Sequence, residues 1–126
     1  MAQMKLNQVT VPATDLDRSI AFYRTLGFTL IVENDHYARF EIGDGESTFS
    51  LHLGGEAGNG PSLYFECEDL DARVAALKAQ GIAFENDPVD RSWLWREASF
   101  RDPAGNRLCL YWAGENRRFP PWRLET

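Results

Sequence analysis

The chain has 126 residues, of which 44% are hydrophobic, so it can bury about two thirds of its unfolded surface as one domain. Its formal net charge of −6 would repel nucleic acid and anionic membrane, so we expect neither as a partner. The sequence has no apolar run long enough to span a bilayer and no signal-peptide pattern, so we expect a soluble, cytoplasmic protein.

The first part of the chain predicts a strand, a helix and three more strands. Alternating side chains predict a strand over residues 5–11, ended by Pro12. Apolar residues at helical spacing then predict a helix that begins with a cap at Thr14 and ends at Gly27, where a left-handed residue would close the last turn. Further strands are expected at 28–33, 37–42 and 48–53.

The second part repeats this plan after a glycine-rich linker over residues 54–61. A strand is expected at 62–65, a helix at 69–80 with Gly81 as its stop, and three strands at 83–85, 93–100 and 107–112. The last residues, 114–126, contain several aromatic side chains, so we expect them to pack against the body of the protein or against a second subunit.

The two parts correspond in register, which indicates an internal duplication. Asp15, Leu16 and Gly27 recur at a constant offset as Asp69, Leu70 and Gly81. Each copy therefore predicts one βαβββ module, and its single helix can cover only one face of its sheet. The other face has to be closed by the second module or by another chain.

Three motifs in this arrangement resemble the vicinal oxygen chelate superfamily, which contains glyoxalase I, extradiol dioxygenases, fosfomycin-resistance enzymes and bleomycin-resistance proteins. They are the two Asp-Leu-Asp junctions between strand and helix, the AFYRTLGF segment over 21–28, and the FRDPAGN segment over 100–106. The resemblance implies an α+β fold of two tandem βαβββ modules, at about 5–54 and 61–113, followed by the tail at 114–126. It also implies curved mixed sheets that enclose a cleft, in a homodimer.

The resemblance also marks the positions where metal-dependent members carry their ligands. Carried over by motif, these positions hold Gln8, Ser50, Ser62 and Cys109. Two neutral hydroxyls are poor ligands for a hard divalent ion, so we predict no metal and no other cofactor. His52 leaves one alternative open, because it lies on the same strand face as Ser50 and would complete an irregular soft-metal site with Gln8 and Cys109.

Other reactive groups have structural explanations that compete with functional ones. Cys67 and Cys109 lie in apolar strand patterns, which favours buried, reduced thiols over reactive ones. Glu66 and Glu97 are candidates for an acid and base pair, but isolated acids on strands are more often solvated or ion-paired. His36 lies in an expected turn, where an exposed loop residue is the simpler interpretation.

Without a metal, the expected cleft has aromatic walls and neutral hydrogen-bonding groups, which suits a flat or amphipathic molecule. Trp93 and Trp95, expected on one face of a strand, either stack on the ligand or belong to the core or the dimer interface. We predict a metal-independent small-molecule binding protein of the bleomycin-resistance type; the alternative is a metal-dependent lyase, dioxygenase or isomerase of the same superfamily. The predicted ligand-binding residues are Gln8, Thr10, Ser50, His52, Ser62, Tyr64, Trp93, Trp95, Cys109 and Tyr111.

Overall fold

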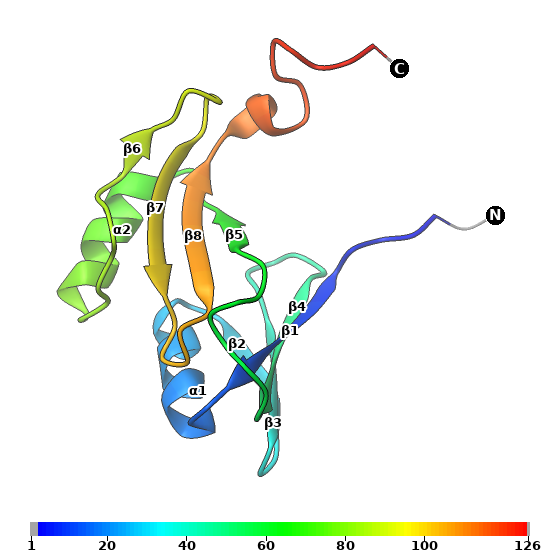
Figure 1. Cartoon of the computed structure of the whole chain (residues 1–126), viewed down its shortest axis with the longest axis vertical. Coiled ribbons are helices and arrows are strands. Elements are labelled where there is room, and N and C mark those ends of the chain that lie inside the picture. The colour runs from blue at the N-terminus through cyan, green and yellow to red at the C-terminus, as the bar shows by residue number, and fades with distance from the viewer. Residues whose placement is uncertain (1–2, 126) are drawn as a thin grey trace. The chain divides into compact units, whose positions relative to one another are not determined.

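The computed structural model describes residues 3–125 and contains two four-stranded mixed sheets, each with one long helix (Figure 1). The elements of the first part are β1 (Gln8–Ala13), α1 (Leu16–Thr25), β2 (Thr29–Glu33), β3 (Tyr37–Glu41) and β4 (Thr48–Leu53). Those of the second are β5 (Leu63–Glu66), α2 (Leu70–Ala79), β6 (Val89–Asp90), β7 (Arg96–Arg101), β8 (Arg107–Trp112) and the short 3-10 helix η1 (Gly114–Arg117). The predicted α+β class and the two mixed sheets are confirmed.

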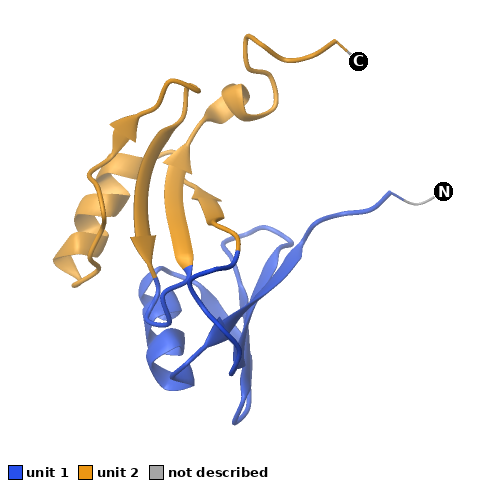
Figure 2. Ribbon diagram, viewed as in Figure 1, with its two compact units in different colours: residues 1–60, 102–106 blue, residues 61–101, 107–126 orange. Residues whose placement is uncertain are grey.

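The chain divides into two compact units, shown in different colours in Figure 2. Unit 1 extends to Gly60 and also includes Asp102–Asn106, whereas unit 2 contains Pro61–Arg101 and the residues from Arg107 onwards. Within the described residues, neither long helix has the length and apolar character needed to cross a bilayer.

Both sheets have the same topology, as a duplication requires. Their strand orders are β1-β4-β3-β2 and β5-β8-β7-β6, and in each the first and last strands of the unit pair in parallel. The remaining pairs are antiparallel. Each unit therefore places its first strand at one edge of its sheet, next to the strand that comes last in its chain order.

Each helix covers one face of its own sheet and leaves the opposite face free of helix. In unit 1, alternation along β3 and β4 directs Phe40, Phe49 and Leu51 into the core beside Tyr23 of α1, where all four side chains are fully buried. In unit 2, Phe100 and Leu108 occupy the equivalent core positions. Burying each such side chain contributes about 1.5–3 kcal/mol, and this is what fixes the register of the strands.

The two helices end in the same way. The Gly27 N–H donates to the Arg24 carbonyl at 3.0 Å, and the Phe28 N–H donates to the Tyr23 carbonyl at 3.1 Å. Gly81 and the residue after it repeat both bonds at the end of α2, and the two glycines have φ of +98° and +96°. These paired bonds form a Schellman motif, so the predicted left-handed stops are confirmed.

Several predicted boundaries are wrong for local reasons. β1 begins at Gln8 and continues through Pro12, because this strand lies at a sheet edge, where proline is tolerated. The helix cap is Asp15 and not Thr14, since the Asp15 carboxylate accepts from the Arg18 N–H at 3.1 Å. The expected strand at 83–85 is reduced to a single bridge at Phe84.

A turn over 91–95 replaces the start of the strand that was predicted from residue 93. The Arg91 N–H donates to the Trp95 carbonyl at 2.8 Å and the Leu94 N–H donates to the Arg91 carbonyl at 3.0 Å. Leu94 has a φ of +67°, which breaks the extended conformation. Trp93 and Trp95 therefore do not share one face of a strand, as the alternation had predicted.

Candidate functional site

The helix-free face of the unit 1 sheet carries a connected polar network. Gln8 Nε2 donates to Ser50 Oγ at 3.0 Å and to Thr10 Oγ1 at 3.0 Å. Gln8 Oε1 accepts a hydrogen bond from the Thr48 hydroxyl. Ser50 is fully buried, whereas Gln8 and Thr10 are exposed. The structure thus brings three of the predicted ligand-binding residues into hydrogen-bonding contact.

Tyr37 and Arg39, both on β3, extend this network, although neither was predicted from the sequence as a site residue. The Tyr37 hydroxyl lies 2.7 Å from Ser50 Oγ and accepts from Arg39 Nε at 2.8 Å. Partial desolvation acts to raise the pKa of Tyr37, but the hydrogen bonds with Ser50 and Arg39 and the nearby guanidinium charge outweigh it and lower the pKa. Alternation along 37–41 was the signal that would have found both residues.

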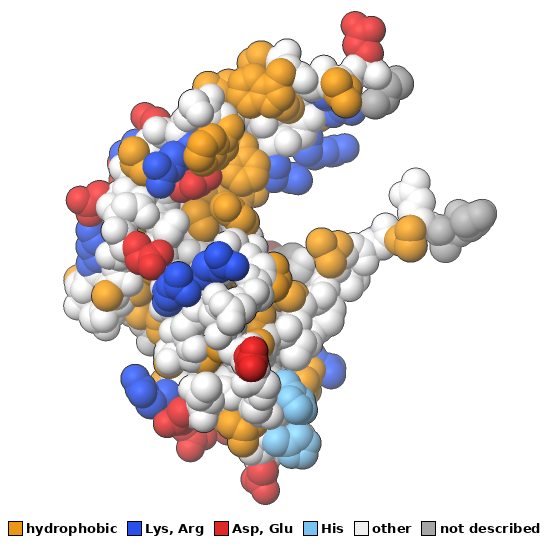
Figure 3. Space-filling model, in the orientation of Figure 1, with side chains coloured by type: hydrophobic (Ala, Val, Ile, Leu, Met, Phe, Trp, Pro, Cys, Tyr) orange, Lys and Arg blue, Asp and Glu red, His pale blue; other side chains and the backbone are white. Residues whose placement is uncertain are grey.

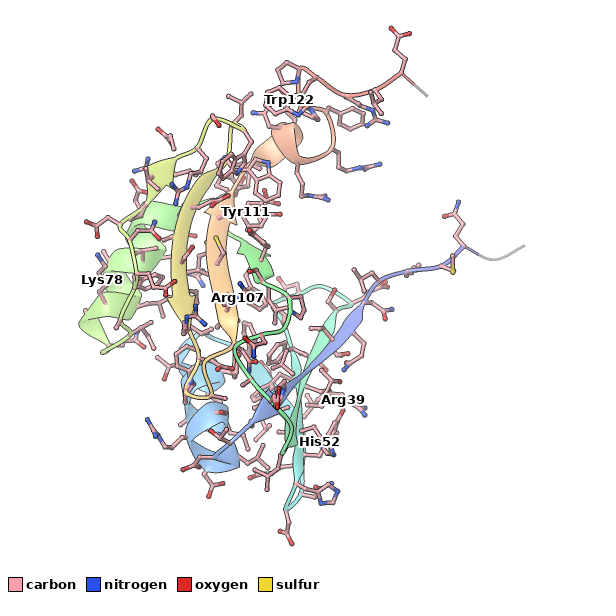
Figure 4. The ribbon with its side chains drawn as sticks, in the orientation of Figure 1. Arg39, His52, Lys78, Arg107, Tyr111 and Trp122 are labelled. Carbon is pink, nitrogen blue, oxygen red and sulfur yellow. The ribbon has the colours of Figure 1, made fainter. Side chains whose placement is uncertain are left out.

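His52 lies at the end of the same face but makes a different contact. It is exposed, and its ring meets the His36 ring edge-on with the centroids 6.2 Å apart. Figure 3 shows the two histidines next to each other on the surface of unit 1, and Figure 4 labels His52 beside Arg39. Both rings are exposed to solvent, which agrees with the interpretation of His36 as an exposed loop residue and of His52 as a solvated side chain.

The helix-free face of the unit 2 sheet is aromatic. The Trp95 and Tyr111 rings are stacked with centroids 4.6 Å apart, and the Tyr64 ring meets both edge-on at 5.7 Å. Cys109, Tyr111 and Ala113 are buried along β8 and its end, with Trp95 packed against them. Tyr64 remains 49% exposed, so this cluster presents a free aromatic surface. Figure 4 labels Tyr111 on β8.

Two carboxylates flank Tyr111, since both Glu66 and Glu97 pair with it across the sheet. Glu97 is only 6% exposed and accepts from Trp93 Nε1 at 2.8 Å, with Arg91 Nε 3.6 Å from its other oxygen. Glu66 accepts from the backbone N–H groups of residues 113 and 114 at 3.1 and 3.0 Å. Both acids therefore have defined structural partners, and Trp93 acts here as a hydrogen-bond donor.

The pKa values in unit 2 reflect burial and negative charge. Burial is the main cause that raises the pKa of the Cys109 thiol to about 11, and Glu97 raises it further. Burial likewise raises the pKa of Tyr64, with Cys109 and Glu97 as further causes, and burial followed by Glu66 raises that of Tyr111. These groups stay protonated and neutral at pH 7. Ser62 is exposed and lies one residue before β5.

The residues at the four metal positions do not fit a divalent ion. The Gln8 amide is engaged at both ends, and the Ser50 hydroxyl is bound by Gln8 and Tyr37. The Cys109 thiol is protonated and donates to the Leu110 carbonyl at 3.4 Å. Metal binding would require deprotonated or lone-pair-rich ligands, which this donor set does not supply. Within either unit, the described residues contain no group of three or more His, Cys, Asp or Glu side chains placed to hold a metal.

A family model matches residues 5–110, a range that extends from before β1 into β8. That model describes the glyoxalase, bleomycin resistance protein and dioxygenase superfamily. The chain belongs to this superfamily. The resemblance on which the fold prediction rested is therefore confirmed over most of the chain.

Within the superfamily, an uncharacterised Bacillus subtilis protein, YraH, is 35% identical over 86% of this chain and 98% of its own length. A Nocardioides protein of the superfamily has a crystal structure with a TM-score of 0.78 at 24% identity, covering 99% of this chain and 92% of that one. A bleomycin-binding protein, solved with bleomycin, has a TM-score of 0.69 at 22% identity over 87% of this chain and 98% of that chain. At such identities the two structures show the shared fold alone.

Proposed function

We propose that this superfamily member is a metal-independent binding protein that holds an aromatic or amphipathic small molecule. The observation that carries the proposal is the Tyr64, Trp95 and Tyr111 cluster on the helix-free face of unit 2. The three rings pack against one another, and Trp95 also packs against the buried residues at the end of β8, so a ligand would meet a rigid surface. Binding that needs no ordering of side chains loses less conformational entropy.

The chemistry of the face supports a flat ligand that is neutral or positively charged. Tyr64 offers an exposed ring, and the stacked Trp95 provides a broad indole surface. Aromatic surface buried against a ligand contributes about 25 cal/mol per Å², and a cation over a ring gains about 0.5–2 kcal/mol more. Glu66 and Glu97 add negative charge beside Tyr111, which disfavours an anionic ligand at this face.

Fluorescence titration tests the proposal. A planar cation such as proflavine should quench tryptophan emission saturably, and a neutral planar compound should do so more weakly. Tyr64→Ala should weaken binding about tenfold or more, because one of the three rings is lost. Tyr64→Phe retains the ring and should bind like the native protein. Unsaturable quenching, or equal affinity in Tyr64→Ala, would overturn the proposal.

Metal independence is tested separately by elemental analysis of the purified protein. We expect no stoichiometric metal, because the amide, hydroxyl and thiol at the four positions are engaged or protonated. One equivalent of zinc, nickel or iron, lost in a Gln8→Ala, His52→Ala double variant, would favour the metal-dependent lyase, dioxygenase or isomerase instead.

Two further parts of the proposal concern the cell and the assembly. We infer a cytoplasmic protein, since Cys67 and Cys109 are both free thiols, as a reducing compartment favours. We also infer a homodimer, because two large aromatic side chains of the tail that follows β8, Phe119 and Trp122, are more than half exposed. Trp122 of this tail is labelled in Figure 4.

A further inference from the structure

The hydrogen-bond network of unit 1 fixes where the Tyr37 proton lies. Ser50 is fully buried and already accepts from Gln8 Nε2, so its own hydroxyl proton needs an acceptor. The Tyr37 oxygen, 2.7 Å away, supplies it. The opposite direction would leave Ser50 with an unused buried donor, which is costly. The Tyr37 oxygen therefore accepts from both Ser50 and Arg39, and its own O–H is not used within this network.

Arg39 next to it has unused donors. Only its Nε is bound to Tyr37, at 2.8 Å, and its guanidinium carbon lies 5.4 Å from the centre of the Tyr37 ring. Among residues 3–125, no carboxylate forms an ion pair with Arg39, although Glu41 follows two residues later on the same strand. The exposed Arg39 side chain thus offers a fork of Nη–H donors beside a phenol whose O–H is not used within the network.

We propose that Tyr37 and Arg39, supported from below by Ser50, form a binding site for the carboxylate group of a small molecule. A planar carboxylate matches the two parallel N–H donors of a guanidinium, and the Tyr37 hydroxyl adds a third donor from the side. This site lies entirely within unit 1 and does not depend on the aromatic face of unit 2. The network beneath it holds both side chains in place before the ligand arrives.

Arginine-labelled full-length protein allows a direct NMR test with benzoate at constant ionic strength, with chloride as the reference anion and inorganic phosphate as a second probe. We expect a saturable shift of the Arg39 Nε–H signal, and tighter binding of benzoate than of phosphate. Backbone signals of β3 follow binding in variants that lack the arginine. Tryptophan emission reports on unit 2 separately, so failure at one face is distinguishable from failure at the other.

Three variants define the site. Arg39→Gln should weaken benzoate binding about tenfold or more, because it removes a charged, two-point hydrogen bond. Tyr37→Phe should cause a smaller loss, about threefold, from one hydroxyl donor. Arg24→Gln removes the same charge from the exposed side of α1 and should bind like the native protein. Circular dichroism of each variant confirms that it is folded.

Several results would overturn the proposal. Equal benzoate affinity in the native protein and in Arg39→Gln would show that the anion binds elsewhere. Equal losses in Arg39→Gln and Arg24→Gln would indicate general charge attraction. Tighter binding of phosphate than of benzoate, lost in Arg39→Gln, would contradict the carboxylate assignment.

Discussion

The four tyrosines of this chain lie in surroundings that shift their pKa values in opposite directions. Burial raises the pKa of Tyr23, Tyr64 and Tyr111, with nearby negative groups as further causes. Tyr37 alone has a lowered pKa: burial opposes the shift, and the bonds with Ser50 and Arg39 together with the Arg39 charge exceed it. Three of the tyrosines therefore stay neutral to higher pH, whereas the hydroxyl of Tyr37 ionises more readily.

Tyr37 should consequently be the first phenol to ionise as the pH rises. Ultraviolet absorbance of phenolate should show one early step, below the usual value of about 10, which Tyr37→Phe removes. Arg39→Gln should move this step to higher pH, because the phenolate loses both a hydrogen bond and a positive neighbour. Tyr64→Phe provides the matched control and should leave the early step in place. An early step that persists in Tyr37→Phe would contradict the assignment.

Sequence alternation predicted which residues share a sheet face wherever the backbone is extended, even where the predicted strand ends were shifted. Gln8, Thr10 and Ser50 meet as expected because period-2 alternation survives a shift of the strand ends. The prediction for Trp93 was wrong because Leu94 in the 91–95 turn has a positive φ, which leucine rarely adopts and which its sequence position does not reveal. Alternation along 37–41 places Arg39 on the same face as Tyr37, but it does not show that the guanidinium bonds the phenol, and Arg39 was therefore not selected.

At the scale of elements, the two Schellman stops make a matched pair. Replacing Gly27 or Gly81 by Val should lower the free energy of unfolding by about 1 kcal/mol or more, because a branched side chain is strained at φ near +98° or +96°. Space is not the cause, since an added Cβ meets nothing within 4 Å at either position. Gly60→Ala is the control, as this glycine lies in open space without a positive φ. Urea denaturation measures all three variants, and an unchanged midpoint for both valine variants would refute the backbone explanation.

A buried polar connection joins α1 to the Asp102–Asn106 segment of unit 1. The Tyr23 hydroxyl donates to Asp102 Oδ2 at 2.6 Å, and Asn106 Nδ2 donates to the same oxygen and to the Pro12 carbonyl, each at 2.8 Å. The other Asp102 oxygen accepts two backbone N–H groups of its own turn. The DPAGN motif thus has a structural role, which its resemblance to the family alone did not specify.

Tyr23→Phe should lower the free energy of unfolding by about 1.5–3 kcal/mol, because a buried carboxylate loses a hydrogen bond. The native protein should also lose stability more steeply than the variant at alkaline pH. Burial and Asp102 raise the pKa of folded Tyr23, so its stabilising contribution is complete below the unfolded pKa of about 10 and declines above it. Urea denaturation as a function of pH measures both effects. A variant as stable as the native protein, with the same alkaline slope, would be inconsistent with this connection.

The order of helices and strands could be predicted from the sequence, because the duplication repeats the residues that mark the element boundaries. β4 and β8 occur at the predicted residues, and both helices end at the predicted glycines. The two-residue strand β6 was not predicted, since it is held by pairing with β7 and has too few residues to show a period. The segment Asp102–Asn106 belongs to unit 1 because of its tertiary contacts, and a local sequence pattern cannot predict these.

For the molecule as a whole, each end of the described chain carries exposed apolar side chains. Phe119 and Trp122 are 56% and 57% exposed, and Met4 and Leu6 are 100% and 95% exposed. Phe119 contacts Arg118 and Arg123 through its ring faces, at 5.5 and 4.3 Å from the guanidinium carbons. The tail therefore leaves much of its aromatic surface available, and of the two partners predicted for it, a second subunit is the one that would cover this surface.

We therefore expect a homodimer in sedimentation experiments at micromolar concentration. Aromatic residues at the centre of an interface each contribute about 2 kcal/mol or more, so a Phe119→Ser, Trp122→Ser variant should dimerise at least about tenfold more weakly. A Phe119→Tyr, Trp122→Phe variant keeps an aromatic ring at both positions and should sediment like the native protein. Because both side chains are already more than half exposed, the serine variant should keep its folded stability, which separates loss of assembly from loss of fold. A native protein that sediments only as a monomer would show that the tail serves another contact.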